Sequence, residues 1–434
     1  MTVAEIAKKA KESSFLLGAL PGAIKNRALQ AMADALRAHA SEILSANRQD
    51  LEAAQEAVTA GTMKSSLFER LKLSPEKLET VIRGISDLIT LPDPVGKVLL
   101  QTALDTDLIL TKVSCPIGLL GVIFEARPDV IPQIAALAVK SGNAAVLKGG
   151  KEAACTNTSL MKVLQQALEQ IDGYPKNSLH LIHTREEAAE MLRLDKYFDL
   201  IIPRGSNRLI AYVKENTKIA VLGHADGVCH IYVAPSADLE KARKICIDAK
   251  TQYPSACNTL ETLLLDEHLP QTFQKTLLDS LLASGVEIYG GPDVGALVQV
   301  AGEVTDWHTE YGDKKLSVKI VKNVTEAVTH INRFGSHHTD CILTRDAQEA
   351  KIFMDLVDSA GVYQNVSTRF ADGYRYGFGA EVGISTGKTH ARGPVGLEGL
   401  TIYKYKLIGD GQIVADYVGE NAKPFLHKPV SEEK

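Results

Sequence analysis

Residues 118–148 of the chain read GLLGVIFEARPDVIPQIAALAVKSGNAAVLK, two apolar stretches with a helical pattern between them. The apolar stretches, residues 118–124 and 144–148, have the length of buried strands. Residues 130–141 between them are followed by Gly142, and glycine commonly ends a helix. A strand, a helix and a second strand in this order form a unit whose strands lie parallel. The stretch therefore predicts an α/β fold with a mostly parallel sheet.

The alternation of strands and helices continues on both sides of this unit. The N-terminal residues predict helices, and Thr2 and Glu5 have the spacing of a capping box. Further strands are predicted at residues 179–183, 200–203, 219–223, 230–233, 259–266, 286–289, 317–321 and 340–344 and near Val362, and further helices at residues 208–216, 239–250, 273–284, 325–332 and 347–357. The series predicts two α/β domains joined near residues 225–227.

Two segments depart from this alternation of strands and helices. Residues 104–113 and 400–417 alternate apolar and polar side chains, which is typical of antiparallel strands with one face in water. Although they are far apart in the sequence, the two segments could pair into a small antiparallel flap that extends the sheet of another subunit. We therefore expect a homodimer or a higher homo-oligomer.

Composition and charge restrict the classes of function. The chain has 434 residues, of which 45% are hydrophobic and 23% are charged, so it can form two or three cores. With a net charge of −5 and interleaved acids and bases, it offers no basic surface for nucleic acid or an anionic membrane. Its apolar runs are far shorter than the roughly 20 residues that span a bilayer, and no cleaved signal is expected. We expect a cytoplasmic protein without nucleic-acid or membrane partners.

The six cysteines indicate neither a disulfide framework nor a zinc site. They are scattered through the chain without a CxxC pair or a His/Cys cluster. The adjacent His337 and His338 would point to opposite faces of a strand, and no acidic residue or cysteine accompanies them at a suitable spacing. No metal site is expected.

One cysteine lies in a loop with a distinctive composition. Cys257 belongs to Tyr253-Pro254-Ser255-Ala256-Cys257-Asn258-Thr259, between the helix predicted at 239–250 and the strand predicted at 259–266. Loops at strand ends often present reactive side chains. Amide dipoles or cations that lower the pKa of the thiol would let the thiolate attack a carbonyl carbon at neutral pH. The alternative is a buried, inert cysteine, and the residue taken alone leaves both interpretations open.

Two predicted strand ends have the composition of nucleotide-binding turns. Lys148-Gly149-Gly150-Lys151 combines glycines, which allow a phosphate or a ribose to come close, with fixed positive charge. Pro203-Arg204-Gly205-Ser206 opens the helix at 208–216, and the N–H groups at a helix start bind anions. A solvated turn would have a similar sequence, and no GxGxxG fingerprint marks a standard dinucleotide fold.

Longer motifs spread over both predicted domains resemble a known family. They are residues 116–118 (PIG), 124–130 (FEARPDV), 203–206 (PRGS), 330–340 (HINRFGSHHTD), 365–370 (NVSTRF) and 377–386 (GFGAEVGIST). With the strand-lysine motif, the Gly-Ser helix start and the cysteine in this order, the chain resembles the aldehyde dehydrogenase superfamily. Within it, these motifs are similar to those of the gamma-glutamyl phosphate reductases, over nearly the whole chain.

This resemblance implies the reduction of L-glutamyl 5-phosphate to L-glutamate 5-semialdehyde with NADPH, in proline biosynthesis. It implies that Cys257 forms a thioester and releases phosphate, while the backbone N–H groups of Cys257 and Asn258 stabilise the oxyanion. Residues 220–227 lack the glutamate with which hydrolysing aldehyde dehydrogenases activate water, so the thioester would survive until it is reduced. Since no kinase module is present, a separate glutamate kinase is a candidate partner.

The resemblance also implies binding residues and domains. The implied cofactor-binding residues are Lys148, Gly149, Lys151, Gly205, Ser206 and Glu310, and the implied substrate-binding residues are Arg127, Asn365, Ser367 and Arg369. Lys151 stands where NAD-preferring relatives carry an acid, which favours NADPH/NADP. The implied domains are an NADP-binding domain with N-terminal helices at 1–101 and 118–226, a catalytic domain with Cys257 at 227–395, and an oligomerisation flap at 102–117 and 396–434.

Two other functions compete with this interpretation. A general aldehyde dehydrogenase would oxidise free aldehydes with NAD and hydrolyse the thioester, and the missing glutamate argues against it. A non-catalytic relative would use the fold as an oligomeric binding or scaffold protein. The presence of Cys257, Lys148 and Glu310 in one chain argues against that function.

Overall fold

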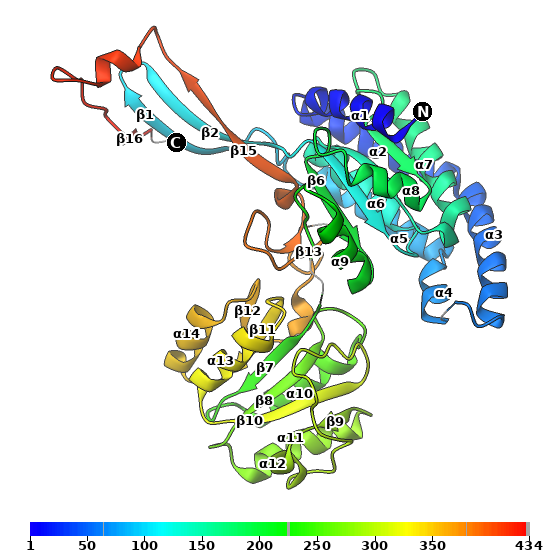
Figure 1. Ribbon diagram of the computed structural model, residues 1–434, viewed down its shortest axis with the longest axis vertical. Helices are drawn as coiled ribbons and strands as arrows, with labels where there is room; N and C mark the ends of the chain where they lie inside the picture. Colours follow the sequence, from blue (N-terminus) through cyan, green and yellow to red (C-terminus); the bar gives the residue numbers. More distant parts are fainter. Residues whose placement is uncertain (64, 224–225, 379, 431–434) are drawn as a thin grey trace. The chain divides into compact units, whose positions relative to one another are not determined.

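The computed structural model describes residues 1–63, 65–223, 226–378 and 380–430, which form two compact units (Figure 1). Unit 1 comprises Met1–Gly205, Tyr212–Val221 and Gly396–Lys434, and unit 2 comprises Ser206–Ala211 and Leu222–Val395. Each unit has its own parallel sheet. His224 and Ala225, near the predicted domain junction, and Gly379 lie outside the described residues.

The sheet of unit 1 has four parallel strands in the order β5-β4-β3-β6. These strands are β3 (Leu119–Phe124), β4 (Ala144–Lys148), β5 (Leu179–Ile182) and β6 (Leu200–Arg204). Helix α6 (Val130–Ser141) connects β3 to β4 and ends at Gly142, whose φ of 72° is a left-handed conformation that glycine adopts without strain. The strand-helix-strand unit predicted from residues 118–148 is confirmed.

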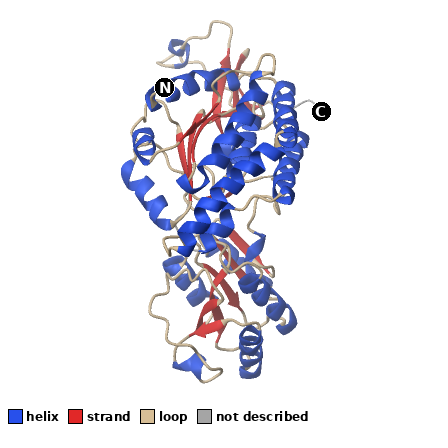
Figure 2. Cartoon of the chain, turned by 90° about the vertical axis from the view of Figure 1, so that its right-hand side faces the viewer, coloured by secondary structure: helices blue, strands red, loops and turns tan. Residues whose placement is uncertain are grey.

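Helices pack on this sheet and against one another (Figures 1 and 2). Helix α1 (Val3–Leu17) contacts β3, β4 and β5, and it begins with the predicted capping box of Thr2 and Glu5. The other helices of unit 1 are α2 (Gly22–Ala38), α3 (Ala40–Thr59), α4 (Ser65–Leu71), α5 (Pro75–Thr90), α7 (Ala154–Glu169) and α8 (Arg185–Met191), while the residues of α9 (Asn207–Asn216) are divided between the units. In the described part of the chain, no helix is both long and apolar enough to cross a membrane.

A separate antiparallel sheet in unit 1 pairs strands from residues 98–116 with strands near the end of the chain (Figure 1). Its strand order is β15-β2-β1-β16, and the strands are β1 (Val98–Asp105), β2 (Leu108–Pro116), β15 (Thr401–Ile408) and β16 (Lys428–Pro429). β15 pairs with β2 along its whole length. The predicted antiparallel pairing of these distant segments is therefore confirmed.

The predicted bounds of both segments were wrong. Residues 104–113 contain a turn, because Asp107 has a φ of 57° and ends the extended backbone between β1 and β2. The strand predicted at 400–417 stops at Ile408, since Gly411 has a φ of 89° and a 3₁₀ helix, Val414–Tyr417, follows. Both breaks carry turn residues in the sequence, Asp105-Thr106-Asp107 and Gly409-Asp410-Gly411, which the predicted strands ran through.

The sheet of unit 2 has six parallel strands in the order β12-β11-β7-β8-β10-β9. They are β7 (Cys229–Val233), β8 (Leu260–Asp266), β9 (Glu287–Tyr289), β10 (Lys315–Val321), β11 (Thr339–Leu343) and β12 (Gly361–Gln364). Successive residues point to opposite faces: Ile231 and Val233 belong to one core cluster and Tyr232 to another. Because helices cover both faces, the strands β7, β8 and β11 are buried along their whole length.

The connecting helices of unit 2 follow the predicted order, except that α12 (Pro292–Gly295) was not predicted. They are α10 (Leu239–Thr251), α11 (Gln271–Ala283), α12, α13 (Val324–Phe334) and α14 (Ala347–Leu356), and β13 (Gly383–Ser385) pairs with β14 (Gly393–Val395) in a small antiparallel sheet.

The strand predicted at residues 219–223 was wrong. Within residues 219–223, Val221 forms a single bridge with Ile201, because the segment meets the edge strand β6 at one residue pair only.

Candidate active site

The loop of Cys257 is a closed turn between α10 and β8. The hydroxyl of Thr259 donates to the carbonyl of Tyr253 at 2.7 Å, and the N–H of Thr259 donates to the carbonyl of Ala256 at 2.9 Å. Cys257 is half-buried. These bonds hold the thiol at the amino end of β8, in the loop that the sequence predicted.

Gly227 and Cys229 pack against the backbone of this loop. A Cβ atom on Gly227 would stand 2.1 Å from the carbonyl oxygen of Cys257 and 2.4 Å from its Cα, so only glycine fits. The thiol of Cys229, the first residue of β7, donates to the same carbonyl at 3.4 Å. The position of Cys257 is therefore set by the chain entering β7.

The electrostatic environment of Cys257 differs from the predicted one. The pKa of its thiol is raised to about 12, mainly by burial and further by the carboxylates of Glu381 and Glu310, while the guanidinium of Arg369 opposes the shift. A cation is present, but desolvation and two carboxylates outweigh it. The condition under which the thiolate would form readily, a pKa lowered by dipoles or cations, is therefore not met by these surroundings.

Glu381 was not among the predicted site residues. Its carboxylate acts on Cys257 and also accepts a hydrogen bond from the N–H of Gly373 at 2.9 Å. The one signal for it in the sequence was its place in the motif at 377–386. A carboxylate so distant from Cys257 in the sequence cannot be assigned to the thiol by spacing.

Asn258 joins the Cys257 loop to the segment that carries Arg369. It is buried, and its side-chain amide donates to the carbonyl of Ala371 at 2.9 Å. Within the described chain, the backbone N–H groups of Cys257 and Asn258 donate to no backbone carbonyl. Both groups remain donors for an oxyanion, and this role stays a prediction.

Arg369 is a buried cation beside this loop. Its Nε donates to Oε1 of Gln252 at 3.0 Å, and its guanidinium lies 5.8 Å from the centroid of the Tyr253 ring. Burial and the neighbouring Arg375 lower the pKa of Arg369. The N–H of Arg369 donates to Oγ of Ser367 at 3.3 Å, so Ser367 caps the 3₁₀ turn Thr368–Phe370. Arg369 therefore lies close to Cys257, as a substrate-binding cation should.

Asn365 lies away from the thiol. It follows the carboxyl end of β12, whereas Cys257 precedes the amino end of β8, so the two residues are at opposite edges of one parallel sheet. The side-chain amide of Asn365 bonds both backbone groups of Thr344, accepting at 3.0 Å and donating at 2.8 Å. This placement lends no support to a substrate-binding role for Asn365.

The cofactor candidates in unit 1 gather at one edge of its sheet. The pairing of β3 places Ile123 beside Lys148 of β4 and Phe124 beside Arg204 of β6, so the carboxyl ends of these strands align. Lys148 is half-buried, and burial lowers the pKa of its ammonium while the Glu152 carboxylate partly offsets the shift. Lys151 is exposed in the 3₁₀ turn that follows.

The donor set at this edge fits a dinucleotide with phosphate groups. Gly149 is buried and a Cβ there would stand 2.2 Å from Nδ2 of Asn157, so the strand end has no room for a side chain. Gly205 follows β6, and Ser206 accepts from the N–H of Leu209 at 3.4 Å where α9 begins. Lysines and an arginine at strand ends of unit 1 are groups that bind anions.

Arg127 follows an unusual backbone conformation. Ala126 has a φ of 33°, a left-handed conformation rarely adopted by residues with a side chain, and its N–H donates to Glu152 at 2.9 Å. Such conformations cost free energy and concentrate at functional sites. Arg127 is half-buried beyond the end of β3.

The residues around the two adjacent histidines make structural contacts. Nδ1 of His337 lies 2.6 Å from the carbonyl of Asp358, and Nδ1 of His338 lies 2.9 Å from the hydroxyl of Thr339. The carboxylate of Asp340 accepts from the N–H of His230 at 2.7 Å and joins β11 to β7. Among the residues that the structure describes, no three metal-binding side chains come together.

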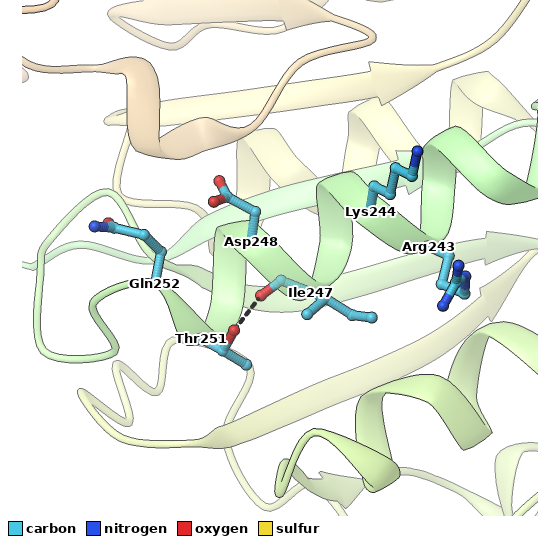
Figure 3. A pocket seen from close by; sticks show the side chains of 6 residues that line it. All are labelled: Arg243, Lys244, Ile247, Asp248, Thr251 and Gln252. Atoms are coloured by element: carbon cyan, nitrogen blue, oxygen red, sulfur yellow. Dashed lines mark hydrogen bonds between the residues drawn. The ribbon is translucent and has the colours of Figure 1, made fainter.

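A hollow on the outer side of α10 ends near Arg369. Figure 3 shows its lining residues, Arg243, Lys244, Ile247, Asp248, Thr251 and Gln252. The hydroxyl of Thr251 donates to the carbonyl of Ile247 within the helix, and Gln252 is the residue that holds Arg369. The hollow contains none of the predicted site residues.

Comparisons with known proteins agree with the fold and with this order of residues. The aldehyde dehydrogenase family model matches residues 1–303. The chain is 51% identical to gamma-glutamyl phosphate reductase of Brachyspira hyodysenteriae over 99% of this chain and 100% of that protein, and 52% identical to the one of Methanosarcina barkeri over 97% and 96%. The crystal structure of gamma-glutamyl phosphate reductase from Thermotoga maritima matches with a TM-score of 0.91 and 40% identity, over 95% of this chain and 100% of that one. The chain therefore belongs to the aldehyde dehydrogenase family and, within it, to the gamma-glutamyl phosphate reductases.

Proposed function

We propose that this protein reduces L-glutamyl 5-phosphate to L-glutamate 5-semialdehyde with NADPH and releases phosphate, as a step of proline biosynthesis. The observation that carries the proposal is the thiol of Cys257 in a closed turn, with Arg369 and Glu310 close enough for their charges to act on it. Relatives about half identical to this chain carry the name of that reductase.

Cys257 is the nucleophile of the proposed reaction. Its sulfur attacks the acyl carbon, the bond from that carbon to the phosphate oxygen breaks, and phosphate leaves as the thioester forms. The thiol loses its proton in this step and the departing phosphate takes it up, while the carboxylates of Glu381 and Glu310 disfavour the thiolate. The N–H groups of Cys257 and Asn258 would stabilise the oxyanion. NADPH, when bound, supplies the hydride that converts the thioester to the aldehyde and frees the thiol.

The other predicted residues bind the cofactor and the substrate in this proposal. Lys148, Gly149, Lys151, Gly205, Ser206 and Glu310 would hold NADPH, with Lys151 near the 2′-phosphate and Glu310 at the nicotinamide ribose. Arg369 would bind the substrate carboxylate, Ser367 would hold the turn that carries it, and Arg127 would bind the leaving phosphate.

The proposal includes an assembly and a location. We propose a homo-oligomer formed through the antiparallel sheet, because β15 exposes Tyr405, Leu407 and Ile408. A cytoplasmic location accords with six free cysteines. A separate glutamate kinase is a proposed partner, and co-purification with such a kinase would test that part.

The reverse reaction tests the proposed function. The protein is incubated with pyrroline-5-carboxylate, which equilibrates with the semialdehyde, together with NADP and phosphate, and the absorbance of the reduced cofactor is followed. A signal that requires phosphate is expected, whereas a phosphate-independent signal would indicate a hydrolysing aldehyde dehydrogenase. Cys257→Ser should abolish turnover and leave NADPH binding intact. Near-normal turnover of this variant would refute the assignment of the nucleophile.

A further inference from the structure

A buried ion pair lies beside the Cys257 loop. Lys250, in the last turn of α10, and Glu261, in β8, have fully buried side chains, and Nζ of Lys250 donates to Oε2 of Glu261 at 2.8 Å. In sequence, the two residues flank the loop that carries the thiol. Removal of two charges from water costs much of what their attraction returns, so stability alone is a weak reason for such a pair.

Glu261 also binds the segment that carries Glu310. Its Oε2 accepts from the N–H of Tyr311 at 3.3 Å, and its Oε1 accepts from the N–H of Gly312 at 3.3 Å. The hydroxyl of Tyr311 lies 2.9 Å from Oγ of Ser317 in β10. Both oxygens of one carboxylate are thus used, and Glu310 is the residue immediately before the two N–H donors.

The charge on Glu261 depends on these partners. Burial raises its pKa to about 7, while Lys250 and the N–H groups of Gly312 and Tyr311 oppose that shift. Burial likewise lowers the pKa of Lys250, and Glu261 and Asp313 oppose it. A charged carboxylate is a stronger acceptor than a neutral side chain. The segment after Glu310 is therefore held best when the pair is ionised.

We propose that Glu261 is a positioning residue that orients Glu310 toward the cofactor through the N–H groups of Tyr311 and Gly312. Lys250 keeps the carboxylate ionised and connects it to the end of α10, so the same pair supports the thiol loop and the Glu310 segment. The inference rests on the proposed role of Glu310 at the nicotinamide ribose. Glu261 itself is fully buried and bonds Lys250 and the N–H groups of Tyr311 and Gly312, so in this proposal it acts only through Glu310.

The test is a double-mutant cycle on NADPH binding, measured by fluorescence titration of the purified full chain. Glu261→Gln should weaken NADPH binding about tenfold, which corresponds to about 1.4 kcal/mol. Glu310→Gln should weaken it as well, and the Glu261→Gln/Glu310→Gln variant should bind no more weakly than Glu310→Gln alone, because one residue acts through the other. Asp266→Asn is the matched control, since Asp266 is a buried carboxylate of the same strand that bonds Tyr232 instead.

The outcomes separate the positioning role of Glu261 from the proposed role of Glu310. Unchanged NADPH binding in Glu261→Gln, multiplicative effects in the cycle, or an equal loss in Asp266→Asn would overturn the positioning role and leave the proposed function in place. Unchanged binding in Glu310→Gln would overturn both the positioning role and the assignment of Glu310. If Glu261→Gln does not fold because Lys250 is left unpaired, Lys250→Met/Glu261→Gln removes both charges. The same tenfold loss of NADPH affinity is expected for this double variant, and unchanged affinity would overturn the positioning role.

Discussion

Gly227→Ala should slow catalysis strongly while the protein stays folded. The new Cβ would stand 2.1 Å from the carbonyl oxygen of Cys257, and ordinary contact begins at 3.4 Å, so the loop has to retreat by the difference, about 1.3 Å. The obstructing atoms belong to the backbone and cannot rotate away as a side chain would. The hydrogen bond from the Thr259 hydroxyl to the Tyr253 carbonyl closes the loop. Because the loop is closed, we expect the backbone shift at Cys257 to move its sulfur atom as well.

The magnitude follows from the size of this shift. A displacement of about 1 Å in a reacting group costs about 100-fold in rate, whereas overpacking costs about 1–3 kcal/mol of folding free energy. We therefore expect kcat of Gly227→Ala to fall about 100-fold while the protein remains folded.

The assay is phosphate-dependent NADP reduction with pyrroline-5-carboxylate, combined with thermal unfolding. Gly84→Ala is the control, because Gly84 lies inside α5 and a Cβ there meets nothing within 4 Å. This control should keep kcat unchanged and gain about 1 kcal/mol of stability, since alanine favours the helix. If Gly227→Ala kept kcat within twofold of the original protein, the argument that Gly227 sets the position of the thiol would fail.

The remaining predictions concern cofactor choice, thiol reactivity and acid stability. Lys151→Glu should lower the ratio of kcat/KM for NADPH to that for NADH, and an unchanged ratio would remove the argument for that lysine. Glu381→Gln should lower the pKa of the Cys257 thiol, so iodoacetamide should alkylate Cys257 faster at pH 8 in this variant than in the original protein, as measured on the peptide that contains Cys257. An equal or slower rate would contradict the role of this carboxylate. Burial lowers the pKa of His330 to about 3 in the folded protein, below its ordinary value of about 6.5. Between these two pH values His330 is protonated in the unfolded chain but not in the folded one, so the free energy of unfolding decreases as the pH falls. His330→Leu should flatten that fall in urea unfolding, and an unaltered slope would show that other groups cause it.

The order of the elements could be predicted because it depends on local patterns. Buried parallel strands need short apolar runs, and the helices between them need a 3.6-residue period and an end signal such as Gly142. The capping box at Thr2 is local for the same reason: its two bonds join residues three apart. The bounds of the antiparallel strands were less accurate, since the turn residues Asp105-Thr106-Asp107 and Gly409-Asp410-Gly411 were included in the predicted strands.

The candidate site was predicted in part. The loop of Cys257 could be located from its neighbours in the chain, and motifs pointed to Arg369 and Glu310. Sequence spacing could not reveal that Asn365 is bonded to Thr344 or that Glu381 acts on the thiol. Those contacts join residues that are distant in the chain and depend on how strands are ordered in the sheet.

The sequence by itself determined most of the parallel strands and their helices, their order, and which loop carries the thiol, because propensity and hydrophobic period act between near neighbours. Only the tertiary structure decided the charge around that thiol, the fit of Gly227 against it and the link from Glu261 to the Glu310 segment. Burial and Coulomb interactions depend on distance in space, and folding brings together residues that sequence separation keeps apart.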